Sequence, residues 1–381
     1  MRKPNESLMA VEALEAWNNA AAPFAAVATL TLRCELMTPM YGGGVTAGEV
    51  DPTLPIRPSA LRGQLRFWWR LLHGRGRPPR EIFAAETAIW GGIAQDRPTA
   101  SRVAVNVTAK SAAATDLIAK SRLPTFPSYA LILDPGADPQ LLRSGYRFQL
   151  SLRFAADLRD DQQAQVIDAV RWWASFGGVG ARTRRGLGAV RVEGLTPVTT
   201  EEAAAKGGRL ILLAPSKTPE LAWKTSVGRL KDFRQKLEVG RNPPAPDSQS
   251  PAGRSRWPEP DAIRELSGHA YPDHAQLLVP GCVFPRAAFG LPIIFHFKNA
   301  PNDKDRHKRD FVRGDFDPDD HTLEPADGSP NNRRERLASP LILRSYWNGT
   351  QWRPAALLLP DWREALGVSL KFKEQNYNPS P

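Results

Sequence analysis

The sequence predicts an α+β protein whose first half has the element order β-α-β-β-α-β, which is the order of a ferredoxin-like domain. Apolar and polar residues alternate in stretches typical of half-buried strands, at 27–36, 102–108 and 145–154, and a short closing strand follows at 189–192. Apolar residues recur at helical spacing in two further stretches, at 57–72 and 160–176. Together these elements predict one domain over residues 27–195, with insertions between its strands and helices.

The rest of the chain divides into three further parts. Residues 1–26 form an N-terminal extension, and residues 196–208 form a linker without a clear pattern. Residues 209–381 have a similar order of strands and helices, which predicts a second α+β domain. Within it the stretch 299–336 mixes charges of both signs and has few apolar residues, so we expect a long, exposed, charged insertion there.

The charge balance of the chain favours a polyanionic partner. Lysine and arginine number 51 against 40 acidic residues, which gives a net charge of +11. Two cysteines far apart in the sequence, Cys34 and Cys282, form neither a disulfide framework nor a zinc pattern. No apolar run reaches the length of a membrane span. We therefore expect a cytoplasmic protein that binds a polyanion and no membrane.

One predicted helix has two unlike sides. Pro58 and Ser59 mark its start, and its apolar side consists of Leu61, Leu65, Trp68, Trp69 and Leu72, so Trp68 is expected in the core. Arg62, Arg66 and Arg70 recur every four residues beside that side, and no acidic residue occurs between Arg57 and Arg80. Like charges at this spacing repel each other on a helix. The column therefore predicts an anionic partner for Arg57, Arg62, Arg66 and Arg70, with a solvated charged face as the alternative.

A glycine-rich loop at 177–188 is the second predicted binding element. It contains five glycines and three arginines directly after a predicted helix. Backbone N–H groups that glycine leaves free can form an anion-binding nest, and arginine binds phosphate. We expect phosphate contacts from Gly177, Gly178, Gly180, Arg182, Arg184, Arg185 and Gly186. The loop should lie beside the arginine helix, because the two helices of such a domain share one face of the sheet. The alternative is an ordinary connection, for which one glycine would suffice.

A shorter block in the second half, Arg254-Ser-Arg-Trp257, has two interpretations. Arg254 and Arg256 could bind phosphate while Trp257 stacks on a base. Trp257 could equally be an anchor of the second core, and the sequence favours neither interpretation.

The sequence predicts no catalytic residue. His73 follows the arginine column and is a candidate general acid or base, but no second catalytic group is placed beside it. Acidic residues and histidines gather between Asp303 and His321, yet lysines and arginines alternate with them, and the fixed offsets of an EF-hand loop are missing. We expect no metal site and no cofactor.

Several of these stretches resemble one known family. The segment from Ile56 to Arg70 closely resembles the first helix of RAMP-superfamily proteins of CRISPR systems, and 175–188 resembles their glycine-rich loop. The blocks 254–264, 286–295 and 336–343 are similar to those of RAMP proteins in type III-B effector complexes. The resemblance implies two ferredoxin-like (RRM-like) domains and a place near the 3′ part of the guide RNA. It also implies guide RNA and target RNA as ligands, other RAMP-type subunits as neighbours, and catalysis by other subunits.

These observations predict a non-catalytic RNA-binding subunit of a ribonucleoprotein effector. One alternative is a metal-independent endoribonuclease that processes CRISPR repeat RNA. A third hypothesis is a scaffold that contacts only protein. RNA binding that weakens steeply with salt separates the first hypothesis from the third, and RNA cleavage by the purified protein separates the first from the second.

Overall fold

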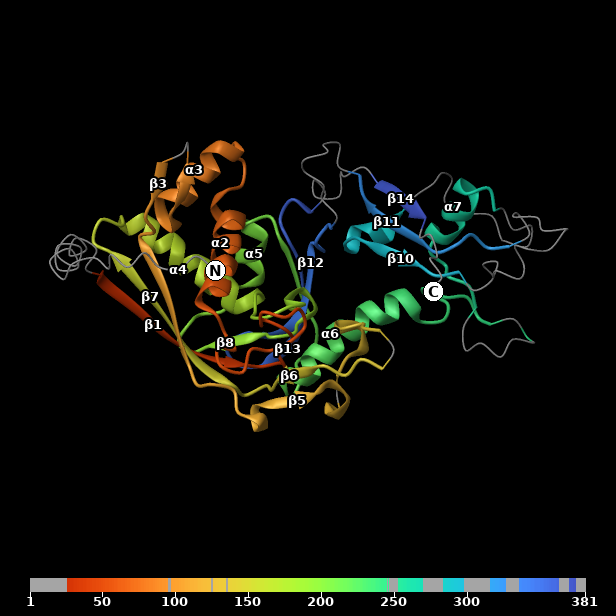
Figure 1. Cartoon of the computed structure of the whole chain (residues 1–381), viewed down its shortest axis with the longest axis horizontal. Helices are drawn as coiled ribbons and strands as arrows, with labels where there is room; N and C mark the ends of the chain where they lie inside the picture. Colours follow the sequence, from red (N-terminus) through yellow and green to blue (C-terminus); the bar gives the residue numbers. More distant parts are fainter. Residues whose placement is uncertain are drawn as a thin grey trace, which may run out of the picture.

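The structure is a computed structural model, drawn in Figure 1. It describes residues 26–94, 97–124, 126–134, 136–244, 246, 253–269, 284–297, 316–326, 336–362 and 370–374. The predicted N-terminal extension and most of the predicted charged insertion lie outside these residues.

The first half contains a four-stranded antiparallel sheet with the strand order β4-β7-β1-β8. Its strands are β1 (Ala26–Leu36), β4 (Val103–Ala109), β7 (Arg147–Ala155) and β8 (Val190–Val192). The alternation fixes the register, since buried Leu32 of β1 lies opposite buried Leu150 of β7. The predicted ferredoxin-like order of the first domain is confirmed.

Helices α2 (Pro58–His73) and α4 (Asp160–Phe176) lie against each other on one side of this sheet, as Figure 1 shows. Arg57 is the N-cap of α2 and Pro58 occupies the first helical position, where its missing N–H costs nothing. The expected apolar side is buried, with Leu61, Leu65, Trp68, Trp69 and Leu72 all in the core. Trp68 is only 1% exposed. Its ring lies 6.0 Å from that of Trp172 and 6.2 Å from that of Phe176.

Short elements fill the connections of the first half. Helix α3 (Pro79–Trp90) follows α2, and the paired strands β2 (Gly92–Ala94) and β3 (Arg97–Thr99) follow α3. Between β4 and β7 lie the paired strands β5 (Leu117–Ala119) and β6 (Gln140–Leu142), with single 3₁₀ turns η2 (Ala114–Asp116), η3 (Lys120–Arg122) and η4 (Ser128–Ala130). The 3₁₀ turn η5 (Thr183–Arg185) lies within the glycine-rich loop.

The predicted linker contains a helix, α5 (Thr200–Ala205). The hydroxyl of Thr199 accepts a hydrogen bond from the backbone N–H of Glu202 and so caps the first turn of α5. The Glu202 carboxylate accepts a hydrogen bond from the backbone N–H of Thr199, which completes a capping box. Arg171 of α4 donates to the same carboxylate. The segment 196–208 is therefore attached to the first domain.

The strands of the second half belong to two separate three-stranded sheets. One sheet has the order β12-β13-β9, from β9 (Arg209–Leu212), β12 (Leu341–Trp347) and β13 (Trp352–Leu358), and α6 (Pro219–Gln235) packs on it. The other has the order β10-β11-β14, from β10 (Ile293–Phe295), β11 (His321–Pro325) and β14 (Leu370–Glu374), with α7 (Glu259–Leu266) and η6 (Pro285–Phe289) nearby. The described strands do not form the single sheet of a complete second ferredoxin-like domain.

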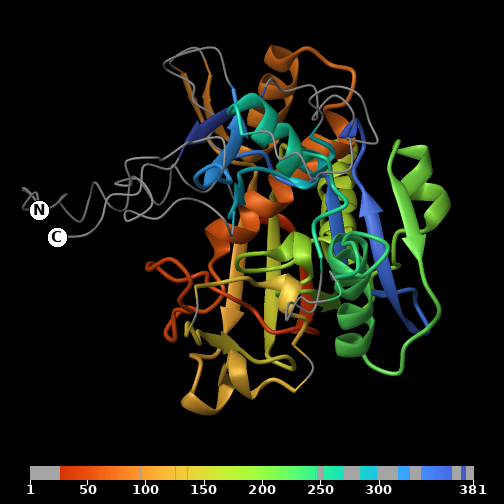
Figure 2. The same cartoon turned by 90° about the vertical axis from the view of Figure 1, so that its right-hand side faces the viewer.

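The two halves share one hydrophobic core. Ile342 and Tyr346 of β12 belong to the same buried cluster as Trp172 and Phe176 of α4. The rings of Phe176 and Tyr346 are stacked with centroids 5.7 Å apart. The sheet β12-β13-β9 thus lies between α4 on one face and α6 on the other. The sheet β10-β11-β14 is a separate group of strands near the C-terminal part of α6 (Figures 1 and 2).

One strand corrects the expectation of an exposed insertion at 299–336. Strand β11 lies inside that stretch, and its Leu323 is fully buried between β10 and β14. A hydrophobic cluster around Leu291, Phe295 and Leu323 forms the core of this small sheet. At least this part of the charged stretch is a folded element.

We expect Trp68→Ala to destabilise the fold. Truncating a buried tryptophan removes its packing against Trp172 and Phe176 and leaves a cavity, which typically costs about 3–5 kcal/mol. Urea unfolding followed by circular dichroism measures the loss. An unchanged midpoint in a soluble variant would show that Trp68 is outside the core.

Candidate nucleic-acid interface

The arginine column of α2 faces an acidic residue of the next helix. Nε of Arg66 and Nη1 of Arg70 each lie 2.6 Å from the same oxygen, Oε1 of Glu86 in α3, and Glu86 is only 4% exposed. The guanidinium of Arg62 donates to the backbone oxygen of Trp90. Helix α3 therefore supplies a counter-charge that the sequence of α2 lacks, so the column does not require an external anion, and its contact with RNA stays a prediction. Arg57 is paired as well, at 3.2 Å from the Asp51 carboxylate.

The partial burial of Arg62 also favours a role in packing α2 against α3. Desolvation lowers the pKa of its guanidinium, the neighbouring charge of Arg66 lowers it further, and Glu86 opposes both effects. Nε of Arg62 is buried without a hydrogen-bond partner in the described part of the chain. A side chain in this position holds α2 against α3 and is a poor contact for a ligand.

A different side of α2 meets the glycine-rich loop, as the sequence predicted. Gln64, Phe67 and Trp68 of α2 line a pocket of about 210 Å³ together with Gly177, Thr183 and Arg184 of the loop. Phe176 and Ile342 complete the lining. The loop and the helix therefore border a common hollow, but the helix contributes glutamine and aromatic side chains to it in place of the arginine column.

The backbone of the glycine-rich loop is largely engaged within the chain. The N–H groups of Val179, Ala181 and Gly188 donate to the backbone oxygens of Gly188, Tyr41 and Pro39. The hydroxyl of Thr38 donates to the oxygen of Gly186 at 2.6 Å and accepts from the N–H of Ala189 at 2.9 Å. These groups are not free to form the predicted nest for an external anion.

The predicted glycines of this loop are required by its packing. Gly180 has φ of +76°, and a Cβ there would lie 2.5 Å from Met40 and 2.6 Å from the oxygen of Tyr41. Gly186 also has φ of +76°, and its Cβ would lie 2.5 Å from the ring of Trp223. Gly177 and Gly178 are buried and equally crowded, by the Trp173 ring and by the Gly188 oxygen. The glycines give the loop its shape, and its side chains remain as possible ligand contacts.

The three arginines of the loop have different surroundings. Arg182 is exposed and adopts the left-handed conformation with φ of 60°. The Arg184 guanidinium lies 5.5 Å above the Phe67 ring and donates to the oxygen of Ser339 in the second half. Nη1 of Arg185 is buried without a hydrogen-bond partner among the described residues. Burial, with the nearby charges of Arg234, Arg182 and Arg184, lowers the pKa of Arg185 to about 10.

The block Arg254–Trp257 packs onto α6. The ring of Trp257 meets the ring of Phe233 edge to face, with centroids 4.9 Å apart. Arg256 donates to the oxygen of Glu238, while the side chain of Arg254 is exposed. The contact of Trp257 with α6 favours the anchor interpretation over base stacking.

His73 at the end of α2 lies near an acidic residue of α4. Its Nε2 lies 3.7 Å from Oδ2 of Asp168 in α4. Burial, together with the charges of Lys206 and Arg77, lowers the pKa of His73, while Asp168 raises it. Nothing in these contacts favours the general acid or base that the sequence offered as a candidate.

Two described acids of the 303–321 stretch form ion pairs. Asp317 lies 2.6 Å from Arg264, and Asp320 lies 2.6 Å from His296. Asp303, Asp305 and Asp310 lie outside the described residues. Within the described residues no group of three potential metal ligands occurs, and no helix is long and apolar enough to cross a membrane.

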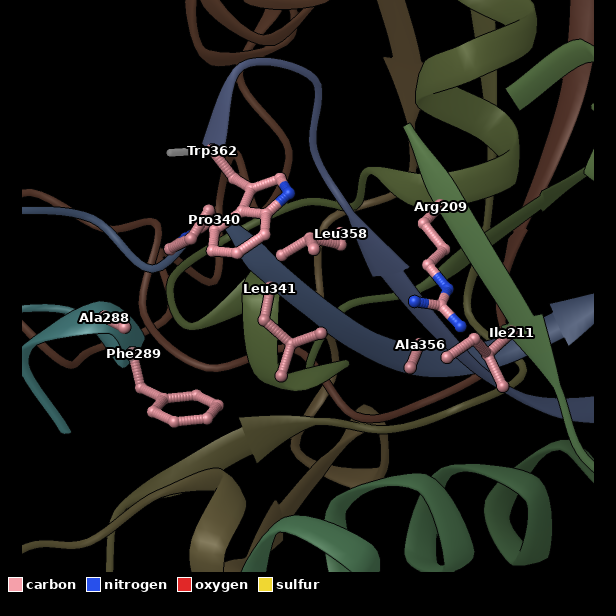
Figure 3. Close-up of a pocket in the computed structure, with 9 residues that line it drawn as sticks. All are labelled: Arg209, Ile211, Ala288, Phe289, Pro340, Leu341, Ala356, Leu358 and Trp362. Atoms are coloured by element: carbon pink, nitrogen blue, oxygen red, sulfur yellow. The ribbon is translucent and has the colours of Figure 1, made fainter. Parts of the chain in front are cut away.

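Two features of the surface were not predicted from the sequence. The open face of the first sheet carries exposed arginines on neighbouring strands, namely Arg33, Arg147, Arg153 and Arg191. Their alternation with buried residues was a visible signal. The second feature is an apolar hollow of about 290 Å³ on the α6 side of the sheet β12-β13-β9, where Leu341, Leu358 and Trp362 meet Phe289 (Figure 3). Its lining offers little polar chemistry.

The sheet order and the glycine-rich loop define the first half as an RRM-like domain of the ferredoxin-like class. A model of the RAMP superfamily matches residues 33–191, the segment that contains most of this sheet, both helices and the loop. Over these residues the chain is similar to the RAMP superfamily.

Several solved structures are similar to the chain. The crystal structure of apo Cmr1 from Pyrococcus furiosus has 13% sequence identity and a TM-score of 0.46, over 93% of this chain and 90% of that one. A chain of the type III-B Cmr-β complex bound to cognate target RNA and AMPPnP has 10% identity and a TM-score of 0.38, over 88% and 97%. A chain of a type IV-B CRISPR complex has 15% identity and a TM-score of 0.32, over 43% and 89%. No curated protein sequence matches the chain significantly.

We expect Glu86→Gln to lower stability. The substitution leaves the partly exposed Arg66 and Arg70 without their shared counter-charge, and losing these charge-assisted hydrogen bonds to a buried acceptor costs about 1–3 kcal/mol. The unfolding free energy from urea titration measures the effect. Glu81→Gln on the exposed side of the same helix is the matched control and should change little. Equal effects of the two variants would contradict the role of Glu86.

The pKa of His73 predicts a pH dependence of stability. A histidine with a lowered pKa in the folded state is neutral there, so the unfolded chain binds the proton first as the pH falls below about 6.5. The stability that His73 contributes is therefore present above that pH and is lost as the pH falls through the folded-state pKa. The loss of unfolding free energy on acidification should be smaller in His73→Gln than in the parent. An equal loss would show that His73 does not contribute.

Proposed function

We propose that this protein is a non-catalytic RNA-binding subunit of a type III-B CRISPR effector complex, equivalent to subunit one (Cmr1) of such complexes. In this role it contacts guide RNA or target RNA near the 3′ end of the guide, beside other RAMP-type subunits. The RAMP match over 33–191 supports the family, and the tryptophan-bearing helix and the blocks of the second half support this particular subunit.

The pocket between α2 and the glycine-rich loop is the observation that carries the proposal. Its lining combines an aromatic ring, Phe67, with the polar side chains of Gln64 and Thr183 and with Arg184. Proteins bind single-stranded RNA with this combination of stacking, hydrogen bonding and positive charge. Arg182, which directly precedes Thr183 in the loop, is exposed and can bind a phosphate.

The proposal revises which predicted residues contact RNA. Arg62, Arg66 and Arg70 serve the packing of α2 on α3, so they support the interface from behind. The loop glycines shape the interface in the same indirect way. Direct contacts are assigned to Gln64, Phe67 and the loop side chains.

RNA binding and its salt dependence test the proposal. We expect the purified protein to bind labelled single-stranded RNA with an affinity that falls steeply as salt rises, because phosphate contacts release counterions. Arg182→Gln should weaken binding several-fold and reduce the slope of log affinity against log salt by about one.

The control removes a charge far from the loop. Arg159 lies at the start of α4, about 25 Å from its C-terminal end, and its exposed pair with Asp161 contributes little stability. Arg159→Gln should leave RNA affinity nearly unchanged. No binding by the parent protein at low salt would overturn the proposed function, and equal effects of the two variants would remove the loop from the interface.

A further inference from the structure

Three arginines from separate segments gather where the glycine-rich loop meets the second half. Arg185 comes from η5, Arg234 from the last turn of α6, and Arg286 from η6. None of the three is exposed, and the Arg286 side chain keeps only 18% of its accessible surface. Three segments that are far apart in the sequence thus each contribute a positive charge to a partly desolvated region.

Part of the hydrogen-bonding capacity of this cluster is unused. Nη1 of Arg185, Nε of Arg234 and Nη2 of Arg286 are buried, and each lacks a hydrogen-bond partner in the described part of the chain. One acceptor, Oε2 of Glu259, also lacks a hydrogen-bond partner there, so the unpaired donors outnumber it. Buried polar groups without partners are uncommon in folded proteins, and charged ones are costly. Three such donors from three side chains indicate a missing acceptor.

The nearby acid neutralises only part of the charge. Glu259 is fully buried, and its Oε2 lies 3.1 Å from Nε of Arg286. Burial has the largest effect on the pKa of the Arg234 guanidinium and lowers it. The charge of Arg286 lowers this pKa further, whereas Tyr129 and Glu259 raise it. Arg234 is in turn the largest charged neighbour that lowers the pKa of Arg185. Glu259 therefore acts on Arg286 and Arg234, whereas the charged groups that act on Arg185 are all arginines.

The surrounding contacts hold these arginines in place without neutralising them. The Arg234 guanidinium lies 5.4 Å above the Phe289 ring. The indole of Trp223 donates to the backbone oxygen of Arg185 at 2.7 Å, which fixes the end of the loop against α6. Such contacts orient the side chains and leave the unpaired N–H groups for another acceptor.

We propose that Arg185, Arg234 and Arg286 form a phosphate-binding site that takes a backbone phosphate of the bound RNA. A phosphate offers several acceptor oxygens at once, which suits unpaired donors that come from separate segments. RNA is the favoured source because Arg185 belongs to the loop that lines the α2 pocket, so one strand could continue from that pocket to the cluster. This identification of the ligand rests on the proposed function, whereas the anion site itself rests on the cluster.

Thermal unfolding with inorganic phosphate as the probe tests the site without RNA. Phosphate should raise the Tm of the parent protein by several degrees relative to sodium chloride of the same ionic strength, because it binds only the folded state. The shift should be lost in Arg234→Gln and kept in the control Arg159→Gln. An equal phosphate shift in Arg234→Gln, or no shift in the parent, would overturn the site.

The unliganded variant provides a second readout. Removing an uncompensated buried charge should leave the Tm of Arg234→Gln equal to that of the parent or higher. A purely structural arginine would lower it, and that result would also overturn the site.

RNA affinity then separates the site from the proposed function. Arg234→Gln should weaken RNA binding about tenfold and reduce the salt slope by about one, while Arg234→Lys, which keeps the charge, should recover part of the loss. Unchanged RNA affinity in Arg234→Gln would overturn the RNA assignment and leave the proposed function standing. A phosphate shift in a parent protein that binds no RNA would keep the anion site and overturn the proposed function, leaving a protein carboxylate as the acceptor.

Discussion

The shape of the glycine-rich loop depends on a buried cation from the other half of the molecule. Arg344 of β12 is only 2% exposed, and burial lowers the pKa of its guanidinium to about 9. It donates to the backbone oxygens of Gly177 at 2.7 Å, Val190 at 3.1 Å and Ser345 at 2.8 Å. The oxygens of Gly177 and Val190 flank the loop at its two ends. A desolvated charge that carbonyl dipoles hold in this way is costly to disturb, so the loop and β12 form one unit.

The contacts of Arg344 are tertiary, and the same distinction between local and tertiary contacts explains what the sequence could predict. The elements of the first domain follow from local patterns, whereas the pairing of its charged residues does not. Strand alternation in 145–154 and helical spacing in 57–72 are local signals, and they led to the correct sheet order and to the burial of Trp68. The counter-charge of the arginine column is a tertiary contact. Glu86 lies 16 residues after Arg70, in a helix whose orientation no local pattern fixes. A column without acids in its own segment therefore suggested an external anion, although the acceptor was in the next helix.

The second half was harder to predict for a related reason. Two of its strands are short, with three residues in β10 and four in β9, so alternation gives little signal there. Strand β11 lies within a highly charged stretch, and Leu323 is its only large aliphatic residue. Its place is fixed by pairing with β10 and β14, which are distant in the sequence. The contact of Trp257 with Phe233, which sequence could not choose over base stacking, is likewise a long-range result.

The contacts of the arginines, more than their number, indicate where a polyanion would bind. Arg62, Arg66, Arg70 and Arg344 have acceptors within the fold, so they do little to attract a ligand. Arg182 is exposed, and Arg185 and Arg234 are buried with unused donors. These three follow the boundary between the glycine-rich loop and α6. The RNA contacts proposed at this boundary therefore exist only when the two halves are docked.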